Sequence, residues 1–420
     1  MGETLKTKER DYMFDVFRGL LMMSIPISHF TKASGNWYAD LYWTSSGIAH
    51  HSPTGFVYIT INVFVMQAFM FLSGYFSKKP EKARATAFRG VLWPYLVFTT
   101  ITMIAAFGFD LPIGHNFSYA APSFALWFLL VLFFYRFFLV EIIKFKWALP
   151  MSITMMLIAG LLPLDQYFAL GRAFSYFPFF MIGYYCSKET LDWIRTLKRK
   201  PVILTLLAVA LVWASYWFQH TKLTLGWYLL KTSYTNFSYL TWYEDVLYRA
   251  ALFGVACGWI VLMVNILPSK KNFLSHVGVN TMPVYIFHLG LRQVMRVYGL
   301  YVECIATLIV AWFAGISLFH KVHKNWIIST ILTLLSIGGT IALTKSGILV
   351  SLYGKCPENM ILFYFLVFGS AILAGASFTA PFWVKLYDIV TEGFVRSSFI
   401  TTLLEGGMKA VKNMKEETRD

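Results

Sequence analysis

The sequence predicts an all-α protein, a polytopic transmembrane helical bundle of about 10–12 spans with a cytoplasmic N-terminus. Of the 420 residues, 57% are hydrophobic and only 14% are charged, whereas about 25% are charged in a typical soluble domain. The apolar residues form repeated blocks of about 20, the length that crosses a hydrocarbon core of roughly 30 Å as a helix. Blocks of this length, rather than ten-residue alternations, indicate helices and not a β-barrel.

The predicted spans follow one another along most of the chain. They cover residues 14–33, 56–76, 88–109, 123–143, 147–164, 169–187, 202–219, 246–267, 279–298, 302–319, 325–344 and 359–382. After residue 384, aromatic and aliphatic residues mix with charged ones, and the end of the chain is polar. This composition predicts a cytoplasmic amphipathic segment that lies at the membrane interface and ends in a frayed tail.

The net charge of +15 is explained by how the charges alternate between successive loops. With the N-terminus inside, the Lys- and Arg-rich loops all fall on the cytoplasmic side. The outer segments hold few basic residues: Lys32, Lys222, Lys231, Lys345 and Lys355. This asymmetry follows the positive-inside rule, so we expect a multi-pass protein of the inner or plasma membrane, in contact with the lipid bilayer. A nucleic-acid partner is not expected.

The first predicted span contains two ionisable residues, Arg18 and His29. Eleven helical steps separate them, which corresponds to a rise of about 16.5 Å and places both side chains within about 20° of one face. An ionisable residue inside a membrane span is costly and usually marks a function. The pair therefore predicts a row of functional side chains that runs from the membrane edge toward the middle of the membrane.

A second histidine, His288, lies at a matching depth in another predicted span. His29 and His288 each follow the start of an inside-to-outside span by about ten residues, or roughly 15 Å, so they could meet near the midplane. Alone, either residue is more simply explained as a hydrogen-bonded structural histidine. Arg292 and Arg296 continue the His288 stripe at four-residue steps. No carboxylate or cysteine lies at ligand spacing, so we expect no metal.

Short motifs with polar residues or glycine accompany this pair along the chain. They are Phe71-Leu-Ser-Gly74-Tyr75, Arg89-Gly-Val-Leu-Trp-Pro94-Tyr95, Leu126-Trp127-Phe-Leu, Phe177-Pro178-Phe-Phe-Met-Ile-Gly183-Tyr184 and Gly278-Val-Asn280-Thr281-Met-Pro-Val-Tyr285-Ile-Phe-His288. Together with Asp15, Arg18-x10-His29 and Gly19, they resemble, in the same order, the membrane acyltransferase 3 family of O-acyltransferases. Within that family, the motifs are most similar to those of the fucose 4-O-acetylase-like branch.

The resemblance divides the chain into three parts: an acyltransferase 3-like transmembrane domain at 1–320, additional transmembrane helices at 321–383, and the C-terminal segment at 384–420. It implies an integral-membrane O-acetyltransferase. Such an enzyme moves an acetyl or other short acyl group from cytosolic acetyl-CoA to a hydroxyl of an extracytoplasmic carbohydrate or polysaccharide.

The residues of the first span suit this reaction. An alcohol is a poor nucleophile at neutral pH, so a general base must take its proton. We assign this role to His29, because a neutral imidazole tolerates burial. Arg18 could bind a CoA phosphate or stabilise charge on the acyl oxygen, with Asp15 orienting its guanidinium. His288 is expected to hold the acceptor or His29.

The cytoplasmic loop after the second span offers cations for CoA, a bulky polyanion. Our candidates are Lys82, Arg84 and Arg89. The family usually has two closely spaced arginines here, and Arg89 matches this pattern better than Arg84 does. Positive-inside bias alone predicts such a loop as well.

Two other interpretations stay open. Many spans with buried charges also suit a transporter or flippase of a glycan or anionic substrate, although no inverted repeat is apparent. A sensor or accessory protein without chemistry is a third interpretation. Outer aromatic and acidic residues could contact a sugar, but an interfacial aromatic belt explains them equally well. They include Trp227, Tyr228, Trp242, Tyr243, Glu244 and Asp245.

Overall fold

The computed structural model describes the part of the chain that carries most of the predicted motifs. The described residues are 11–31, 53–108, 118–122, 126–164, 167–196, 200–221, 225–231, 233–234, 240–279, 281–282, 285–286, 327, 331 and 385–391. Within these ranges every regular element is a helix and none is a strand. Three helices there are long and apolar enough to cross a membrane: Pro80–Ile104, Lys200–Phe218 and Trp242–Ile266. The all-α prediction is confirmed.

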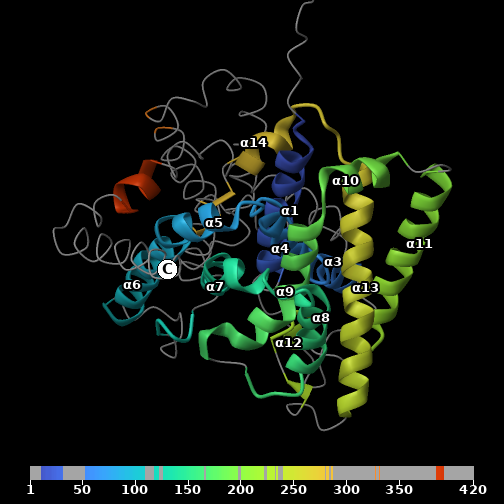
Figure 1. Ribbon diagram of the computed structural model, residues 1–420, viewed down its shortest axis with the longest axis horizontal. Helices are drawn as coiled ribbons and strands as arrows, with labels where there is room; N and C mark the ends of the chain where they lie inside the picture. Colours follow the sequence, from blue (N-terminus) through green and yellow to red (C-terminus); the bar gives the residue numbers. More distant parts are fainter. Residues whose placement is uncertain are drawn as a thin grey trace, which may run out of the picture.

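The helices are distributed as follows along the chain (Figure 1). They are α1 (Met13–Thr31), α3 (Pro53–Asn62), α4 (Val65–Tyr75), α5 (Pro80–Ala87), η1 (Phe88–Leu92), α6 (Trp93–Gly108), α7 (Trp127–Ile142), α8 (Ala148–Ala159), η2 (Tyr167–Ala169), α9 (Leu170–Tyr185), α10 (Lys188–Arg195), α11 (Lys200–Gln219), α12 (Leu225–Tyr228), α13 (Trp242–Ile266) and α14 (Phe273–Val279).

Five of the predicted spans coincide with single helices, namely α1, α7, α9, α11 and α13. The span predicted at 56–76 is instead two helices, because α3 ends at Asn62 and the backbone of Phe64 turns away with φ −137°. The β-branched run Ile59-Thr-Ile61 has low helix propensity and precedes this break. α8 has only 12 residues, about 18 Å, and is shorter than the predicted 147–164.

The third predicted span begins earlier than the sequence indicated. Pro80 occupies the first turn of α5, where its missing N–H leaves no donor unsatisfied. From there α5, η1 and α6 continue as one apolar helix to Ile104. The predicted spans at 302–319 and 359–382, and almost all of 325–344, lie outside the described residues, as does most of 279–298. α14 begins at Phe273, six residues before the predicted start of the span 279–298.

Two pairs of helices approach each other so closely that only glycine fits at their crossings. A Cβ atom on Gly19 of α1 would lie 2.0 Å from the backbone oxygen of Leu274, and one on Gly278 of α14 would lie 1.7 Å from that of Asp15. Gly74 of α4 and Gly183 of α9 form a second reciprocal crossing, at 1.9 Å from each other's helix backbone. Small residues let membrane helices pack backbone to backbone in this way.

We expect Gly278→Ala to destabilise the protein by about 1–3 kcal/mol or more, because the new methyl group meets a backbone atom that cannot rotate away. Gly254→Ala in α13 is the matched control, since nothing lies within 4 Å of a Cβ there. The control should be neutral or slightly stabilising. Thermal unfolding of both variants in detergent measures the difference. Equal midpoints would contradict the close crossing of α1 and α14.

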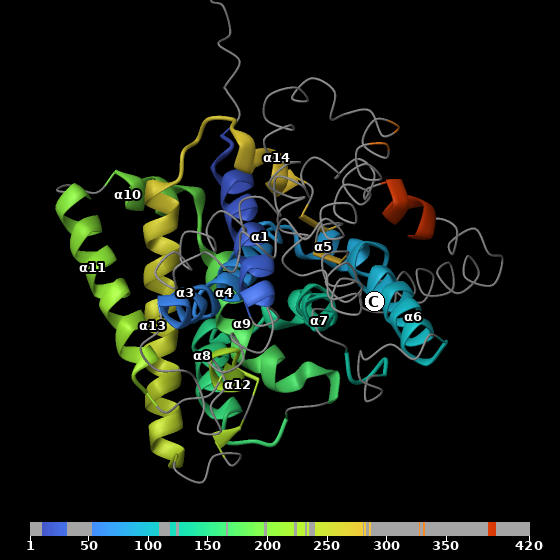
Figure 2. The ribbon, with the colours of Figure 1, turned by 180° about the vertical axis from the view of Figure 1, so that it is seen from behind.

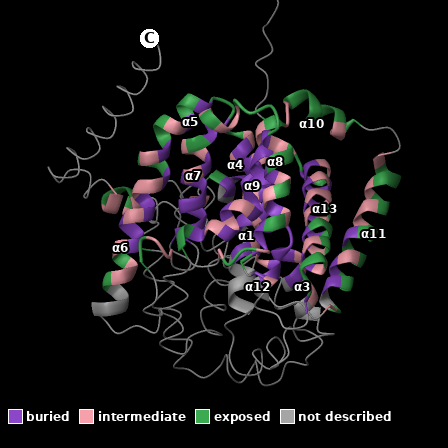
Figure 3. Ribbon diagram, turned by 60° about the horizontal axis from the view of Figure 1, so that its bottom comes forward, coloured by how far each residue is buried: buried purple, intermediate pink, exposed green. Residues whose placement is uncertain are grey.

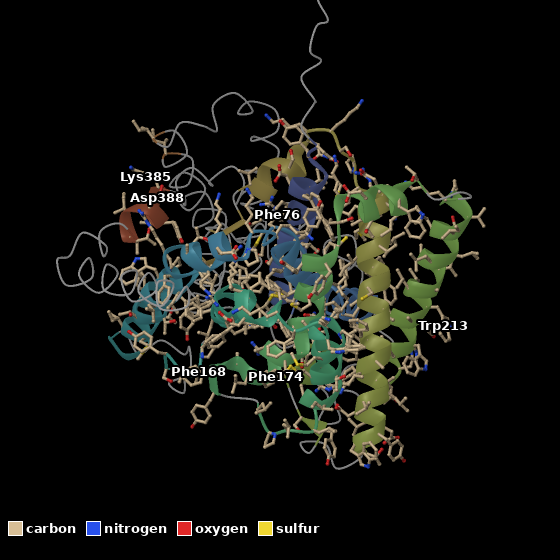
Figure 4. All side chains as sticks on the ribbon, viewed as in Figure 1. Phe76, Phe168, Phe174, Trp213, Lys385 and Asp388 are labelled. Atoms are coloured by element: carbon tan, nitrogen blue, oxygen red, sulfur yellow. The ribbon has the colours of Figure 1, made fainter. Side chains whose placement is uncertain are left out.

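α11 and α13 lie side by side at one edge of the molecule in both opposite views (Figures 1 and 2). α4 and α9 lie in its interior, where Figure 3 colours them mainly as buried. α11 carries exposed apolar side chains along its length, and Trp213 projects outward from it (Figure 4). They include Val202, Leu206, Val209 and Trp213. An apolar exposed face of this length suits contact with lipid.

Segments predicted to be cytoplasmic meet at one end of the bundle. The backbone N–H of Tyr12 donates to the oxygen of Ser269 at 3.0 Å. Arg195 of α10 donates to Ser269 at 2.8 Å and pairs with Asp11 at 3.3 Å. Lys78 donates to the last carbonyl groups of α9, at Gly183, Tyr184 and Cys186. We call this the basic end, and its contacts agree with the predicted alternation of loops.

The opposite end of the bundle is held by a buried ion pair. Arg249 and Asp245 of α13 pair at 2.8 Å, and their side chains are 1% and 0% exposed. Trp227 donates to Asp245 at 2.8 Å, and Arg249 donates to Ser175 of α9 at 3.2 Å. Gly160 leaves the space for this pair, because a Cβ there would lie 1.9 Å from the Asp245 carboxylate.

The helical segment 385–391 packs on α6 rather than extending freely from the bundle. The indole N–H of Trp93 donates to the backbone oxygen of Thr391 at 3.2 Å, and the rings of Phe98 and Tyr387 stack at 5.8 Å. Lys385 and Asp388 project from this segment (Figure 4). The predicted C-terminal segment thus has an apolar face in contact with the third span.

Candidate functional site

A cavity of about 300 Å³ lies between α1, α4, α7 and the residues Thr281, Met282 and Tyr285. Its walls are mainly aromatic and aliphatic, with two guanidinium groups and three hydroxyl groups among them. The lining residues are Arg18, Met22, Met66, Phe69, Leu72, Ser73, Phe76, Phe128, Leu132, Arg136, Thr281, Met282 and Tyr285. An apolar pocket with a few convergent polar groups is the usual form of a small-molecule site.

α1 brings Arg18 to this cavity near the basic end. Asp15, one turn earlier and almost fully buried, pairs with the Arg18 guanidinium at 3.0 Å. The guanidinium also lies over the ring of Phe76, 4.8 Å from its centroid, and Phe76 lies beside α1 (Figure 4). The predicted orientation of Arg18 by Asp15 is therefore present. These two contacts restrict the guanidinium to the cavity wall.

Arg136 of α7 is a second arginine in the same wall, and the sequence analysis missed it. Its Nε atom is buried without a hydrogen-bond partner. Among the residues that the structure describes, no carboxylate pairs with it, since Glu141 further along α7 binds Arg84 and Lys144 instead. A single arginine inside the apolar block 123–143 was the available signal, because such residues usually mark a function.

The wall opposite α1 continues toward a third arginine. The rings of Tyr285 and Phe128 are 5.7 Å apart. Arg172 of α9 lies over the ring of Trp127, 4.6 Å from its centroid. The motifs around Trp127 and Tyr285, far apart in sequence, are therefore brought together beside the cavity.

The two predicted histidines differ in what the structure describes of them. His29 lies in the last turn of α1, so one continuous helix connects it to Arg18, as its spacing predicted. From Arg18 the backbone rises about 16.5 Å to His29. His288 lies outside the described residues, so its predicted partnership with His29 stays a prediction.

The basic loop and α5 place their cations in different environments. Lys82 of α5 and Arg89 of η1 are exposed. Arg84 instead donates to the backbone oxygen of Phe137 at 2.7 Å and to Glu141 at 3.1 Å, which ties α5 to α7. Arg89 lies in a π-helical turn, a feature frequent at functional sites.

Lys78 of the same loop is exposed, and its ammonium group also contacts the end of α9. Burial lowers the pKa of Lys78 from its ordinary value. The ammonium group donates hydrogen bonds to the carbonyl groups at the end of α9. A cation at a helix C-terminus also interacts favourably with the helix dipole. Of the three predicted cations, Lys82 and Arg89 are exposed and available to a donor, as is Lys79 of the same loop.

Three of the outer residues considered for a sugar contact are buried. Trp227, Tyr228 and Asp245 are each 0% exposed, because they form the ion-pair network and its surroundings. Trp242 and Tyr243 at the start of α13 are exposed. Glu244 accepts from Thr241 in the capping box of α13. Among these described residues, Trp242 and Tyr243 are the aromatic pair exposed for stacking on a sugar ring.

Within the described ranges, no group of three or more His, Cys, Asp or Glu side chains is arranged to hold a metal ion. The charged groups that line the cavity there are guanidinium groups. This arrangement can bind and orient an anionic or acyl-bearing molecule, and α1 leads from it to a histidine that can accept a proton.

A comparison with known protein families agrees with this chemistry. The family model described as an acyltransferase domain matches residues 11–345, which include α1, the cavity and both predicted histidines. No curated protein and no solved structure matches the chain significantly.

Proposed function

Because the chain belongs to the membrane acyltransferase 3 family, we propose that it moves an acetyl group from acetyl-CoA at the basic end to a carbohydrate hydroxyl at the opposite end. The observation that carries this proposal is the cavity with Arg18 in its wall and one continuous helix from Arg18 to His29. The donor would enter from the cytosol and the acceptor from the extracytoplasmic side of the inner or plasma membrane.

Each residue of this path has a role that its chemistry supports. Arg18, fixed by Asp15 and Phe76, stabilises negative charge on the donor. His29 takes the proton of the acceptor hydroxyl as its oxygen attacks the thioester carbonyl. The bond between the carbonyl carbon and sulfur then breaks, and protonated His29 returns the proton so that CoA leaves as the thiol. His288 holds the acceptor or orients His29.

The first contacts of CoA are assigned to the exposed cations near the basic end. Lys82 and Arg89 face solvent there and can attract the nucleotide phosphates. Arg84 contributes by holding α5 against α7 through Phe137 and Glu141. Its role in this proposal is therefore to position the helix that carries Lys82.

The test supplies purified protein in detergent with acetyl-CoA labelled in the acetyl group, together with an extracted polysaccharide fraction. We expect loss of the thioester and transfer of label to carbohydrate, and neither should occur with heat-denatured protein. A transporter or flippase would leave acetyl-CoA intact and move substrate across liposome membranes. That outcome would overturn the proposal.

A further inference from the structure

The cavity beside α1 carries a positive charge that nothing described around it neutralises. Arg18 has Asp15 as its counterion at 3.0 Å. For Arg136, the described residues include no ion-pair partner, and its Nε atom is buried and unbonded. Arg136 as a whole is partly buried. A guanidinium whose Nε is desolvated and unbonded is costly in an apolar wall, so its presence points to an anionic ligand.

Both arginines lie at a similar depth from the basic end. Arg18 follows the first residue of α1 by five positions, and Arg136 precedes the last residue of α7 by six. These offsets correspond to rises of about 7.5 and 9 Å. Because both side chains also line the same cavity, one small anionic group can interact with both guanidinium groups.

The rest of the lining limits what this group can be attached to. The cavity of about 300 Å³ is at the small end of ligand pockets, which hold about 300–1,000 Å³. Its aromatic and methionine walls suit an apolar or amide-bearing chain, and Ser73 and Thr281 offer hydroxyl groups. A narrow arm that bears a small anionic group suits this space.

We propose that Arg18 and Arg136 together bind one oxyanion group of the acyl donor, with Arg136 as the residue that selects for its charge. This inference rests on the proposed function. The oxyanion is the phosphate of a phosphopantetheine arm or the free carboxylate of a dicarboxylic acyl group, since guanidinium forks bind both. The rise from Arg18 to His29 is comparable with an extended phosphopantetheine arm, which favours the phosphate.

Binding of small probes to purified protein tests this directly. The probes are phosphopantetheine, pantetheine, which lacks the phosphate, and succinyl-pantetheine, which has a carboxylate instead. We expect Arg136→Met to weaken phosphopantetheine binding by about tenfold to a hundredfold, the usual loss for a charge-assisted hydrogen bond. Pantetheine should bind wild type and variant alike. Lys144→Gln, just beyond the end of α7 and exposed, should bind all probes as wild type does.

A second measurement separates ligand binding from a structural role. Without ligand, Arg136→Met should unfold at a higher temperature than wild type, because the variant removes a partly buried charge that has no ion-pair partner among the described residues. A structural arginine would give the opposite change. Should Arg136→Met not fold, Arg136→Lys replaces it. We expect this variant to bind the anionic probe several-fold more weakly, because lysine cannot form the bidentate contact.

The outcomes distinguish the two anion sources and the two proposals. Dependence on Arg136 for succinyl-pantetheine alone would assign the site to a carboxylate. If neither anionic probe depends on Arg136, the inference is wrong. Turnover of acetyl-CoA is measured in parallel on wild-type protein. Turnover without dependence on Arg136 overturns only the inference, whereas binding that depends on Arg136 without turnover overturns only the proposed function.

Discussion

Replacing His29 by alanine is expected to lower the rate of acyl transfer by about 10²–10⁴-fold, the usual contribution of a general base. His29 lies at the far end of α1 from the arginine that lines the cavity. Without its imidazole, the attacking hydroxyl keeps its proton and remains a poor nucleophile. The measurement is the initial rate of label transfer from acetyl-CoA by purified variant and wild type.

His220→Ala is the matched control for this variant. His220 is exposed beyond the end of α11, where its ring lies 4.2 Å from that of Tyr216. We expect its rate to equal that of wild type. Both variants should unfold at the wild-type temperature, which separates loss of chemistry from loss of structure. An active, folded His29→Ala protein would contradict the assignment of the base.

Removing Arg249 is expected to destabilise the protein by about 3–5 kcal/mol, because the Asp245 carboxylate is then buried without its cation. The two side chains are 1% and 0% exposed and 2.8 Å apart, so water cannot replace the lost partner. Arg249→Met tests this without a large change in volume. The free energy of unfolding in mixed detergent micelles, titrated with a denaturing detergent, measures the loss.

Two comparisons identify the cause of that loss. The double variant Asp245→Asn with Arg249→Met removes both charges and keeps an oxygen for the Trp227 indole, so it should recover much of the stability. Lys144→Gln breaks an ion pair whose partners are 67% and 50% exposed. It should change stability by no more than about 1 kcal/mol. Equal losses for Arg249→Met and Lys144→Gln would contradict the role of the buried pair.

Residue type and spacing were enough to predict the course of α1 and the ion pair near its start. The predicted placement of Arg18 and His29 on one face requires an unbroken helix between them. α1 is unbroken from Met13 to Thr31. The ion pair between Asp15 and Arg18 also follows from their three-residue spacing. Such features depend on local geometry, which the sequence specifies directly.

Features that depend on which helices meet could not be predicted in this way. Gly19 and Gly278 are far apart in sequence, and only their packing explains why neither can carry a side chain. Trp227 is of the residue type found at membrane interfaces, yet it is buried. Its indole N–H donates a hydrogen bond to Asp245. Arg136 was detectable, since it interrupts an apolar block, but its place beside Arg18 required the fold.

The sidedness of the reaction tests the central claim, that acyl transfer runs along α1 from the basic end to the opposite end. Protein is reconstituted in liposomes with one orientation, and labelled acetyl-CoA is supplied only on the face that bears Asp11 and Arg195. A polysaccharide fraction is supplied on both faces, and the two pools are separated before the label in each is counted. We predict labelled carbohydrate inside the liposomes and CoA thiol outside. Label confined to carbohydrate on the face that received acetyl-CoA would contradict the claim.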